Sequence, residues 1–346
     1  MLKYLITGGS GFIGSNFIHY MLGKYDNIEI INLDSLTYAG NLQNLSDIEN
    51  NSCYTFIKED ICNYHSISKV FEEKSPDYII NFAAESHVDR SILNPDIFVR
   101  SNVLGVQNLL QASLDHDIKK YVQISTDEVY GSLGKTGFFT ETTPLNPRSP
   151  YSASKAGADL LAQAYFHTFG LPVNITRCSN NYGPYQFPEK LIPLIILNCL
   201  SGKKIPVYGD GLNIRDWIHV SDHCSAIDAV LHKGTPGEVY NIGANNERSN
   251  IEIVKSIIEI MAKLNPDLSI SDDLITYVED RKGHDRRYAI DSSKIQEELG
   301  WKAETGFVEG LDNTIKWYLG HKDWLMSVVN KEYLEYYNKN YKTNFN

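Results

Sequence analysis

Apolar and polar residues follow two alternating patterns through the first half of the chain. Short apolar runs are followed by longer segments with the apolar spacing of an amphipathic helix. Strands separated by such helical segments predict βαβ units and a parallel sheet that is buried on both faces. Right-handed crossovers then give a doubly wound α/β fold of the Rossmann type. The expected strands are 3–9, 28–34, 54–60, 77–84, 120–127 and 172–180, and the expected helices are 10–25, 65–74, 94–116 and 149–170.

The second half has a less regular pattern, which predicts a smaller, mixed α/β lobe that binds the substrate. Turns rich in proline and glycine interrupt expected helices at 191–200 and 251–264, and 275–280 has the pattern of a short strand. We expect two domains that are not divided by a single cut. Residues 1–181 form the main domain, to which the segments at about 216–244 and 322–336 return, and residues 182–215 and 245–321 form the lobe.

Composition sets bounds on this picture. The 346 residues are 42% hydrophobic and 22% charged, which is ordinary for a globular protein. Because no apolar run approaches the roughly 20 residues that span a bilayer, no membrane segment is expected, and MLKYLITGG is predicted to be a first strand rather than a signal peptide. The net charge of -11 disfavours a nucleic-acid partner. Five scattered cysteines without a CxxC motif favour a reducing, cytoplasmic setting and argue against a metal site.

A glycine-rich loop, GGSGFIG, lies between the first expected strand and the first expected helix. Gly8, Gly11 and Gly14 permit a tight turn and close approach of the backbone to a pyrophosphate, which would face the helix N-terminus. A plain glycine turn is the alternative. Asp34 argues for a dinucleotide, because a carboxylate at the end of the second strand can accept both ribose hydroxyls. It would repel a 2′-phosphate, so we predict NAD rather than NADP as the cofactor.

Tyr151 and Lys155, in YSASK, lie one turn apart on the expected helix 149–170. An ammonium group beside a phenol favours the phenolate, so we expect Lys155 to lower the pKa of Tyr151. Tyr151 is then a candidate base that removes a hydroxyl proton as hydride leaves the adjoining carbon, while Lys155 can bond to the nicotinamide ribose. An exposed helix face is the alternative, and the preceding glycine loop argues against it.

Two adjacent carboxylates, Asp127 and Glu128, end the expected strand 120–127 in STDEVYG. Crowded like charges raise one of the two pKa values, so one carboxyl can stay protonated while the other is ionised. Such a pair can supply the acid and the base for an elimination of water. The alternative is an acid pair that stabilises a helix N-terminus. The residues alone do not distinguish the acid from the base.

GGSGFIG, Asp34, STDEVYG and YSASK together resemble the sugar-nucleotide branch of the extended short-chain dehydrogenase/reductase superfamily. Within this branch the sequence is most similar to the dTDP-glucose 4,6-dehydratase family, and the similarity extends through AAESHVDRSI, NNYGP, RDWIHVSDH and GHDRRYAID. The TDE triplet, Thr126 to Glu128, distinguishes dehydratases from epimerases, since epimerases of the superfamily typically lack the two adjacent acids. The resemblance implies oxidation of dTDP-glucose at carbon 4, loss of water across carbons 5 and 6, and return of the hydride to carbon 6. The product implied by the resemblance is dTDP-4-keto-6-deoxyglucose, which would feed deoxysugars such as rhamnose.

The resemblance also implies residue roles, with Glu128 as the base, Asp127 as the acid and Thr126 bonded to the oxygen on carbon 4. It implies a homodimer formed through the helices at 102–116 and 152–169. Further cofactor contacts implied by it are Phe12, Ile13, Ser35, Thr37, Asp60, Ile61, Ala83, Ala84, Ser101 and Asn181. The implied substrate contacts are Ser86, Thr126, Asn180, Lys190, Leu191, Pro206, Val207, Tyr208, Arg215, Asn250, Arg281 and His284.

Some of these positions also have other interpretations. Arg215 and Arg281 have guanidinium groups suited to a diphosphate, but a charge run can also be a solvated face. Asn180 and Asn181 can bond sugar or nicotinamide, or can simply form the turn before Gly-Pro. One departure concerns Lys282, where the family usually has proline, and the change is expected to loosen that loop and to add a cation.

Three rival functions are weighed. A UDP-sugar 4-epimerase is disfavoured by the TDE triplet, and a GDP-mannose dehydratase is disfavoured by Asp34 with its preference for NAD. A catalytically silent NAD-binding regulator is disfavoured by the intact Thr126, Asp127, Glu128, Tyr151 and Lys155.

Overall fold

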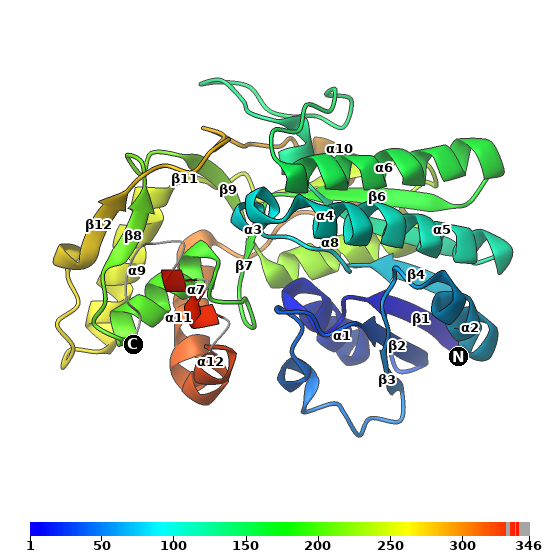
Figure 1. Cartoon of the computed structure of the whole chain (residues 1–346), viewed down its shortest axis with the longest axis horizontal. Coiled ribbons are helices and arrows are strands. Elements are labelled where there is room, and N and C mark those ends of the chain that lie inside the picture. Colours follow the sequence, from blue (N-terminus) through cyan, green and yellow to red (C-terminus); the bar gives the residue numbers. More distant parts are fainter. Residues whose placement is uncertain (330–332, 336, 339–346) are drawn as a thin grey trace.

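The structure is a computed structural model that describes residues 1–329, 333–335 and 337–338. Figure 1 shows a larger body around a long parallel sheet and a smaller mixed lobe beside it. Among the described residues, seven strands form the main sheet in the order β10-β6-β5-β4-β1-β2-β3, and all of its pairs are parallel. The predicted doubly wound Rossmann fold is thereby confirmed. These strands are β1 (Leu2–Thr7), β2 (Ile28–Asp34), β3 (Tyr54–Lys58), β4 (Tyr78–Asn81), β5 (Lys120–Thr126), β6 (Val173–Cys178) and β10 (Val239–Ile242).

Helices cover both faces of the main sheet because neighbouring residues of a strand point to opposite sides. Leu5 packs into one hydrophobic cluster and Ile6 into another, and Ile31 and Ile30 divide in the same way. In the described part of the chain, no helix has the length and apolar character needed to cross a membrane. The first face is covered by α2 (Tyr64–Lys74), α5 (Val106–Asp115) and α6 (Pro150–Phe169), and the second by α1 (Phe12–Lys24), α8 (Val220–Lys233) and α10 (Ser293–Leu299).

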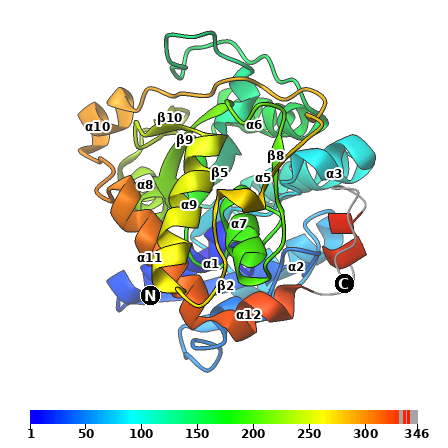
Figure 2. The same cartoon turned by 90° about the vertical axis from the view of Figure 1, so that its left-hand side faces the viewer.

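The smaller lobe, which faces the viewer in Figure 2, has its own hydrophobic core. Ile195, Ile257 and Ile315, from three different helices, are fully buried in it. Its strands are β7 (Asn180–Tyr182), β9 (Ile214–His219) and β11 (Glu247–Ser249) in one sheet, and β8 (Ile205–Tyr208) and β12 (Ile275–Val278) in another. Its helices are α7 (Leu191–Leu200), α9 (Asn250–Leu264) and α11 (Phe307–Gly320), and a short 3-10 turn lies at η4 (Asp272–Leu274). Another 3-10 turn, η1 (Leu42–Leu45), lies in the larger body, where Leu45 packs in the cluster of the main sheet.

The chain after residue 321 packs differently from the expectation that a helix at 322–336 joins the main domain. Trp324 and Leu325, in α12 (Lys322–Val328), lie in the hydrophobic cluster of the lobe. The apolar side of α12 therefore completes the lobe, although the Trp324 indole also donates to Asn44 Oδ1 of the main domain at 2.8 Å. Residues 330–332 and 336 of the predicted helix lie outside the described residues.

The segment expected as one helix at 94–116 is interrupted. It consists of α4 (Pro95–Val99), a π-helical turn η2 (Arg100–Gly105) and α5, and it follows the short α3 (Val88–Leu93). The wide turn directs Asn102 inward, where its side chain bonds to the backbone N–H and carbonyl of Glu85 and to the Ser154 hydroxyl, each at 2.9 Å. Such π-turns are frequent at functional sites, and this one holds the loop after β4 against α6.

Candidate active site

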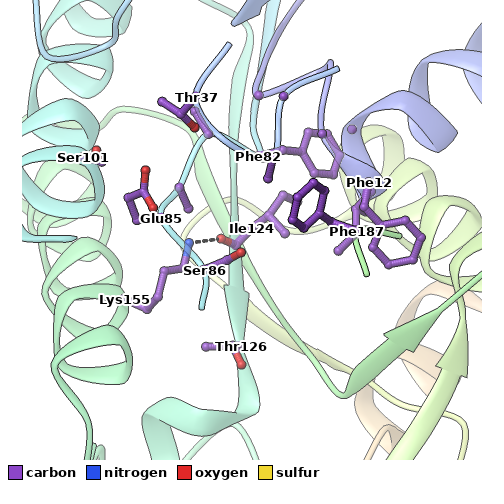
Figure 3. A pocket seen from close by; sticks show the side chains of 18 of the residues that line it. Phe12, Thr37, Phe82, Glu85, Ser86, Ser101, Ile124, Thr126, Lys155 and Phe187 are labelled. Carbon is purple, nitrogen blue, oxygen red and sulfur yellow. Dashed lines mark hydrogen bonds between the residues drawn. The ribbon is translucent and has the colours of Figure 1, made fainter. Parts of the chain in front are cut away.

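A cavity of about 300 Å³ lies beyond the carboxyl ends of β2, β4, β5 and β6, next to the point where the strand order reverses between β1 and β4. Ligands of doubly wound sheets bind at this edge. In Figure 3, Phe12, Phe82 and Phe187 gather on one side of the cavity, and Ser101, Glu85 and Lys155 lie on the other. All of the predicted cofactor residues line it, namely Gly8, Gly11, Phe12, Ile13, Gly14, Asp34, Ser35, Thr37, Asp60, Ile61, Ala83, Ala84, Ser101, Tyr151, Lys155 and Asn181.

The glycine loop has no room for side chains at Gly8, Gly9 and Gly14. Gly8 has a φ of +69°, and a Cβ placed there would lie 2.6 Å from the Ala83 nitrogen. Gly11 is the N-cap of α1, and no side chain of the described residues bonds to the first N–H groups of this helix. A helix N-terminus of this kind attracts a phosphate group. The loop therefore fits the pyrophosphate of a dinucleotide.

Asp34 is fixed at the end of β2 by two backbone donors. Ser10 N–H bonds to Oδ2 at 2.9 Å and Leu36 N–H bonds to Oδ1 at 2.8 Å. Burial raises the pKa of Asp34, and these two bonds oppose the rise. The carboxylate is thus oriented in the cavity wall, as a contact to ribose hydroxyls requires.

Tyr151 and Lys155 are positioned by the start of α6. Ser149 forms a capping box with Ser152, and Pro150 takes the first helical position, so Tyr151 falls in the first turn. Lys155 Nζ donates to the Ile124 carbonyl oxygen at 2.6 Å, which ties the helix to β5 (Figure 3). The helix thus brings both side chains to the cavity wall.

The expected lowering of the Tyr151 pKa is wrong for this structure. Burial raises the pKa of Tyr151 well above its ordinary value, and the negative charge of Glu128 raises it further. The Lys155 ammonium, which is bonded to the Ile124 carbonyl, does not outweigh these two effects. Sequence spacing alone could not show how deeply the phenol is buried.

The predicted acid pair lies on the 3-10 turn η3 (Asp127–Tyr130) at the end of β5. Thr126 begins this turn and accepts from the Glu128 N–H at 3.3 Å. Thr126, Asp127 and Glu128 line the same cavity as Tyr151 and Lys155. The structure therefore brings together all five residues predicted to be catalytic.

The two acids have unequal surroundings. Burial raises the pKa of Asp127 well above its ordinary value, and the charge of Glu128 raises it further. Burial also raises the pKa of Glu128, but the positive charges of Arg281, Arg215 and Lys190 oppose the rise. The pKa of Asp127 is thus raised more strongly than that of Glu128, which favours the protonated form of Asp127.

A second cavity, of about 160 Å³, adjoins the first and extends into the lobe. Ser86, Glu128, Asn180, Glu189 and Lys190 line both cavities. The predicted substrate contacts are divided between the two. Thr126 lines the first, Ser86, Asn180 and Lys190 line both, and Leu191, Pro206, Val207, Tyr208, Arg215, Asn250, Arg281 and His284 line the second.

Cations concentrate in the second cavity. The Arg215 guanidinium lies 4.2 Å from the centre of the Tyr288 ring and donates to the Asp285 carbonyl oxygen at 2.9 Å. Arg281 lies 3.7 Å from the Asp89 carboxylate. Burial and the charge of Arg281 lower the pKa of His284 to about 4. The buried guanidinium group of Arg215 and the partly buried one of Arg281 fit an anionic ligand such as a diphosphate.

Comparison with known proteins agrees with this geometry. The family profile described as GDP-mannose 4,6 dehydratase matches residues 5–314. The dTDP-glucose 4,6-dehydratase of Xanthomonas campestris pv. campestris strain B100 is 50% identical over 344 residues, which cover 96% of this chain and 97% of the relative. The chain belongs to the dTDP-glucose 4,6-dehydratase family.

Two solved structures of the dTDP-glucose 4,6-dehydratase family have the same fold. That of Bacillus anthracis strain Ames, in complex with NAD, is 52% identical with a TM-score of 0.87 and covers 95% of this chain and 100% of its own. That of Streptomyces venezuelae, with NAD and dTDP bound, is 45% identical with a TM-score of 0.90 and covers 94% of this chain and 100% of its own. The resemblance stated from the sequence motifs is thereby confirmed.

The departure from the dTDP-glucose 4,6-dehydratase family at Lys282 does not remove its neighbours from the site. Lys282 is exposed, whereas Arg281 and His284 still line the second cavity. The neighbouring Arg286 and Arg287 instead form ion pairs, with Asp210 at 2.8 Å and with Glu247 at 2.6 Å. The cation cluster of this loop is thus divided between the cavity and salt bridges outside it.

Glu189 is a site residue that the sequence reasoning missed. It is buried between the two cavities, where its carboxylate accepts from the Tyr38 hydroxyl and from Arg90 Nε, both at 3.0 Å. An acid beside Lys190 in PEKLIP is a signal that could have pointed to it. Its partners, however, lie about a hundred or more positions away in the sequence and meet it only in the fold.

Proposed function

We infer that the protein is an NAD-dependent dTDP-glucose 4,6-dehydratase, a hydro-lyase that forms dTDP-4-keto-6-deoxyglucose. The observation that carries this inference is the meeting of a Tyr/Lys pair with two unequal carboxyl groups in one cavity wall. The Tyr/Lys pair serves an oxidation, and the acid pair serves an elimination. Relatives of the same name, about half identical over nearly the whole chain, support the assignment.

The site residues divide the reaction between them. NAD, when bound, accepts hydride from carbon 4 of the glucose unit and later returns it to carbon 6. Tyr151 takes the proton of the hydroxyl on carbon 4 as its phenolate, a form that the positive charge of bound NAD would favour against the effect of burial, and Thr126 bonds to the same oxygen. The new ketone acidifies the proton on carbon 5, which Glu128 removes and gives back to carbon 5 when hydride is returned to carbon 6. Asp127, held protonated by burial, gives its proton to the hydroxyl on carbon 6, which leaves as water.

Binding is assigned to the two cavities. The glycine loop and Asp34 hold NAD in the first cavity, and the carboxylate of Asp34 favours NAD over NADP. Arg215 and Arg281 hold the diphosphate of the substrate in the second cavity. Glu128 and Lys190 line both cavities and so stand where the sugar meets the nicotinamide. We assign the other predicted cofactor contacts to NAD and the other predicted substrate contacts to the sugar nucleotide.

Labelled substrate tests this function. dTDP-glucose with deuterium on carbon 4 is expected to lose one water and to carry the label on carbon 6 of the product, because the hydride never leaves the site. Mass spectrometry measures both changes, and UDP-, CDP- and GDP-glucose serve as comparison substrates. An unchanged dTDP-glucose mass would overturn the assignment, and label lost to solvent would overturn the internal hydride return.

We also propose that two copies pair through the helices at 102–116 and 152–169. Apolar side chains of neighbouring helices are exposed there, with exposed fractions of 44–57% for Leu93, Val99, Leu104 and Leu160. Such a patch is typical of a protein interface. Light scattering should give twice the 39.2 kDa mass of one chain. Leu160→Glu should give the mass of a single chain, and a monomeric wild type would contradict the pairing.

The proposed setting is the cytoplasm, where the product would supply the synthesis of deoxysugars such as rhamnose. All five cysteines are free, as is usual in a reducing compartment. The proposed division into domains follows the sequence prediction, except that α12 is assigned to the lobe because Trp324 and Leu325 lie in its core.

A further inference from the structure

The catalytic side chains stand on two separate elements. Tyr151 and Lys155 belong to α6, whereas Asp127 and Glu128 belong to η3 at the end of β5. The proposed reaction needs both groups around one sugar ring, and a displacement of about 1 Å can cost about a hundredfold in rate. Ala156 of α6 packs in the same hydrophobic cluster as η3 and so holds the two elements together. Apolar packing is not directional, however, so it does not fix the orientation of η3 relative to α6.

A buried chain of polar contacts joins α6 to η3. Asp159 lies one helical turn beyond Lys155, and its Oδ2 accepts from Arg177 Nε at 2.8 Å. Arg177, on β6, also donates from Nη1 to the hydroxyl oxygen of Tyr130 at 3.0 Å. Tyr130 is the last residue of η3, and its hydroxyl donates to Asn241 Oδ1 at 2.8 Å.

The members of this chain are hidden from solvent. Asp159, Arg177 and Tyr130 are at most 2% exposed, so each of their contacts is made in a medium of low polarity. There a charge-assisted hydrogen bond is strong and an unpaired charge is costly. The three side chains are therefore held in one arrangement, which the Tyr130 ring reinforces by stacking on Phe139 with ring centres 5.0 Å apart.

We propose that Asp159, Arg177 and Tyr130 form a positioning link that fixes η3 against α6 and thereby places Glu128 over the carbon that Tyr151 has helped to oxidise. These three are positioning residues and do not line either cavity. The proposal rests on the proposed function. Tyr151 and Lys155 are also held by the capping box of α6 and by the Ile124 carbonyl, so the oxidation step does not depend on the link. The elimination step does depend on it, because the link holds the turn that bears Glu128.

Two variants break the link at different points. Tyr130→Phe removes one hydroxyl and keeps the ring stacked on Phe139. Asp159→Leu combined with Arg177→Met removes the ion pair without leaving a buried charge, and such replacements are often neutral for stability. Tyr121→Phe is the matched control, because the Tyr121 hydroxyl is equally buried but bonds to Gln123 at 2.9 Å, outside the link.

Rapid mixing with dTDP-glucose separates the two steps, since the absorbance of bound NADH rises with oxidation and falls after elimination. We expect both link variants to form NADH at the wild-type rate and to consume it about tenfold more slowly, which corresponds to about 1.4 kcal/mol. KM for dTDP-glucose should stay unchanged. The control should show wild-type rates for both steps, even if its melting temperature falls as much as those of the link variants.

Other outcomes would count against the link. Wild-type decay of NADH in Tyr130→Phe and in the double variant would overturn it, and so would an equal loss of both steps that merely follows the loss of stability. A wild-type protein that forms neither NADH nor product from dTDP-glucose would instead show that the proposed function is wrong. The two failures are therefore distinguishable in one series of measurements.

Discussion

Glu128→Gln is expected to reduce bound NAD when dTDP-glucose is added and then to stall before water is lost. The amide keeps the shape of the carboxylate but cannot take the proton from carbon 5, whereas the oxidation relies on Tyr151, Lys155 and Thr126. A positioned general base contributes about 10²–10⁴ to a rate, so kcat should fall by about that factor. The measurements are the absorbance of accumulated NADH and the yield of dehydrated product.

The control for this variant is Glu259→Gln, which removes the same charge from an exposed ion pair on α9 and should leave both steps unchanged. If Glu128→Gln turned over at the wild-type rate, Glu128 would not be the base. If it formed no NADH, Glu128 would act already in the oxidation. The charge of Glu128 is one of the effects that raise the pKa of Tyr151, so the rise of NADH should shift to lower pH in the variant.

Much of the site could be predicted because its signals are local in the sequence. The glycine loop and Asp34 belong to one βαβ unit, and strand ends meet at one edge of a parallel sheet by topology alone. Tyr151 and Lys155 share a helix face whatever the rest of the chain does. The capping box at Ser149, which sets where this helix begins, is likewise encoded within a few residues.

Other features depend on contacts between segments that are distant in the sequence, and they could not be predicted from the sequence. Glu189 receives its partners Tyr38 and Arg90 from the other domain. The π-helical turn around Asn102 has no signal in the apolar period, which continues through it. The placement of α12 was missed because an amphipathic helix shows that it packs but not against which core.

The difference in surroundings between Asp127 and Glu128 is an example of information that the residues alone do not hold. Both are acids at the end of one strand, and both are buried. Cations that reach Glu128 come from three separate segments, at Lys190, Arg215 and Arg281. Arg215 and Arg281, which we assign to the diphosphate, thus also oppose the rise of the Glu128 pKa that burial causes.

Tyr151→Phe is expected to abolish the step that Glu128→Gln leaves intact. Without the phenol, the hydroxyl proton on carbon 4 has no acceptor, so hydride transfer should slow by about 10²–10⁴ and no NADH should accumulate. The ring should remain in place, because it packs with Phe98 at 6.3 Å between ring centres and with Val88. Since the interaction acts in the transition state, kcat and kcat/KM should fall together.

Tyr165→Phe is the matched control, since its hydroxyl belongs to the same helix but bonds to Gln111 at 3.0 Å and does not line the cavity. Stopped-flow absorbance at several pH values decides the result. Loss of NADH formation in Tyr151→Phe, beside its accumulation in Glu128→Gln, would order the two residues in time and assign them to different bonds. NADH formed at the wild-type rate in Tyr151→Phe would show that another group takes the proton. The high pKa that burial and Glu128 give to Tyr151 would then keep the phenol neutral throughout the reaction.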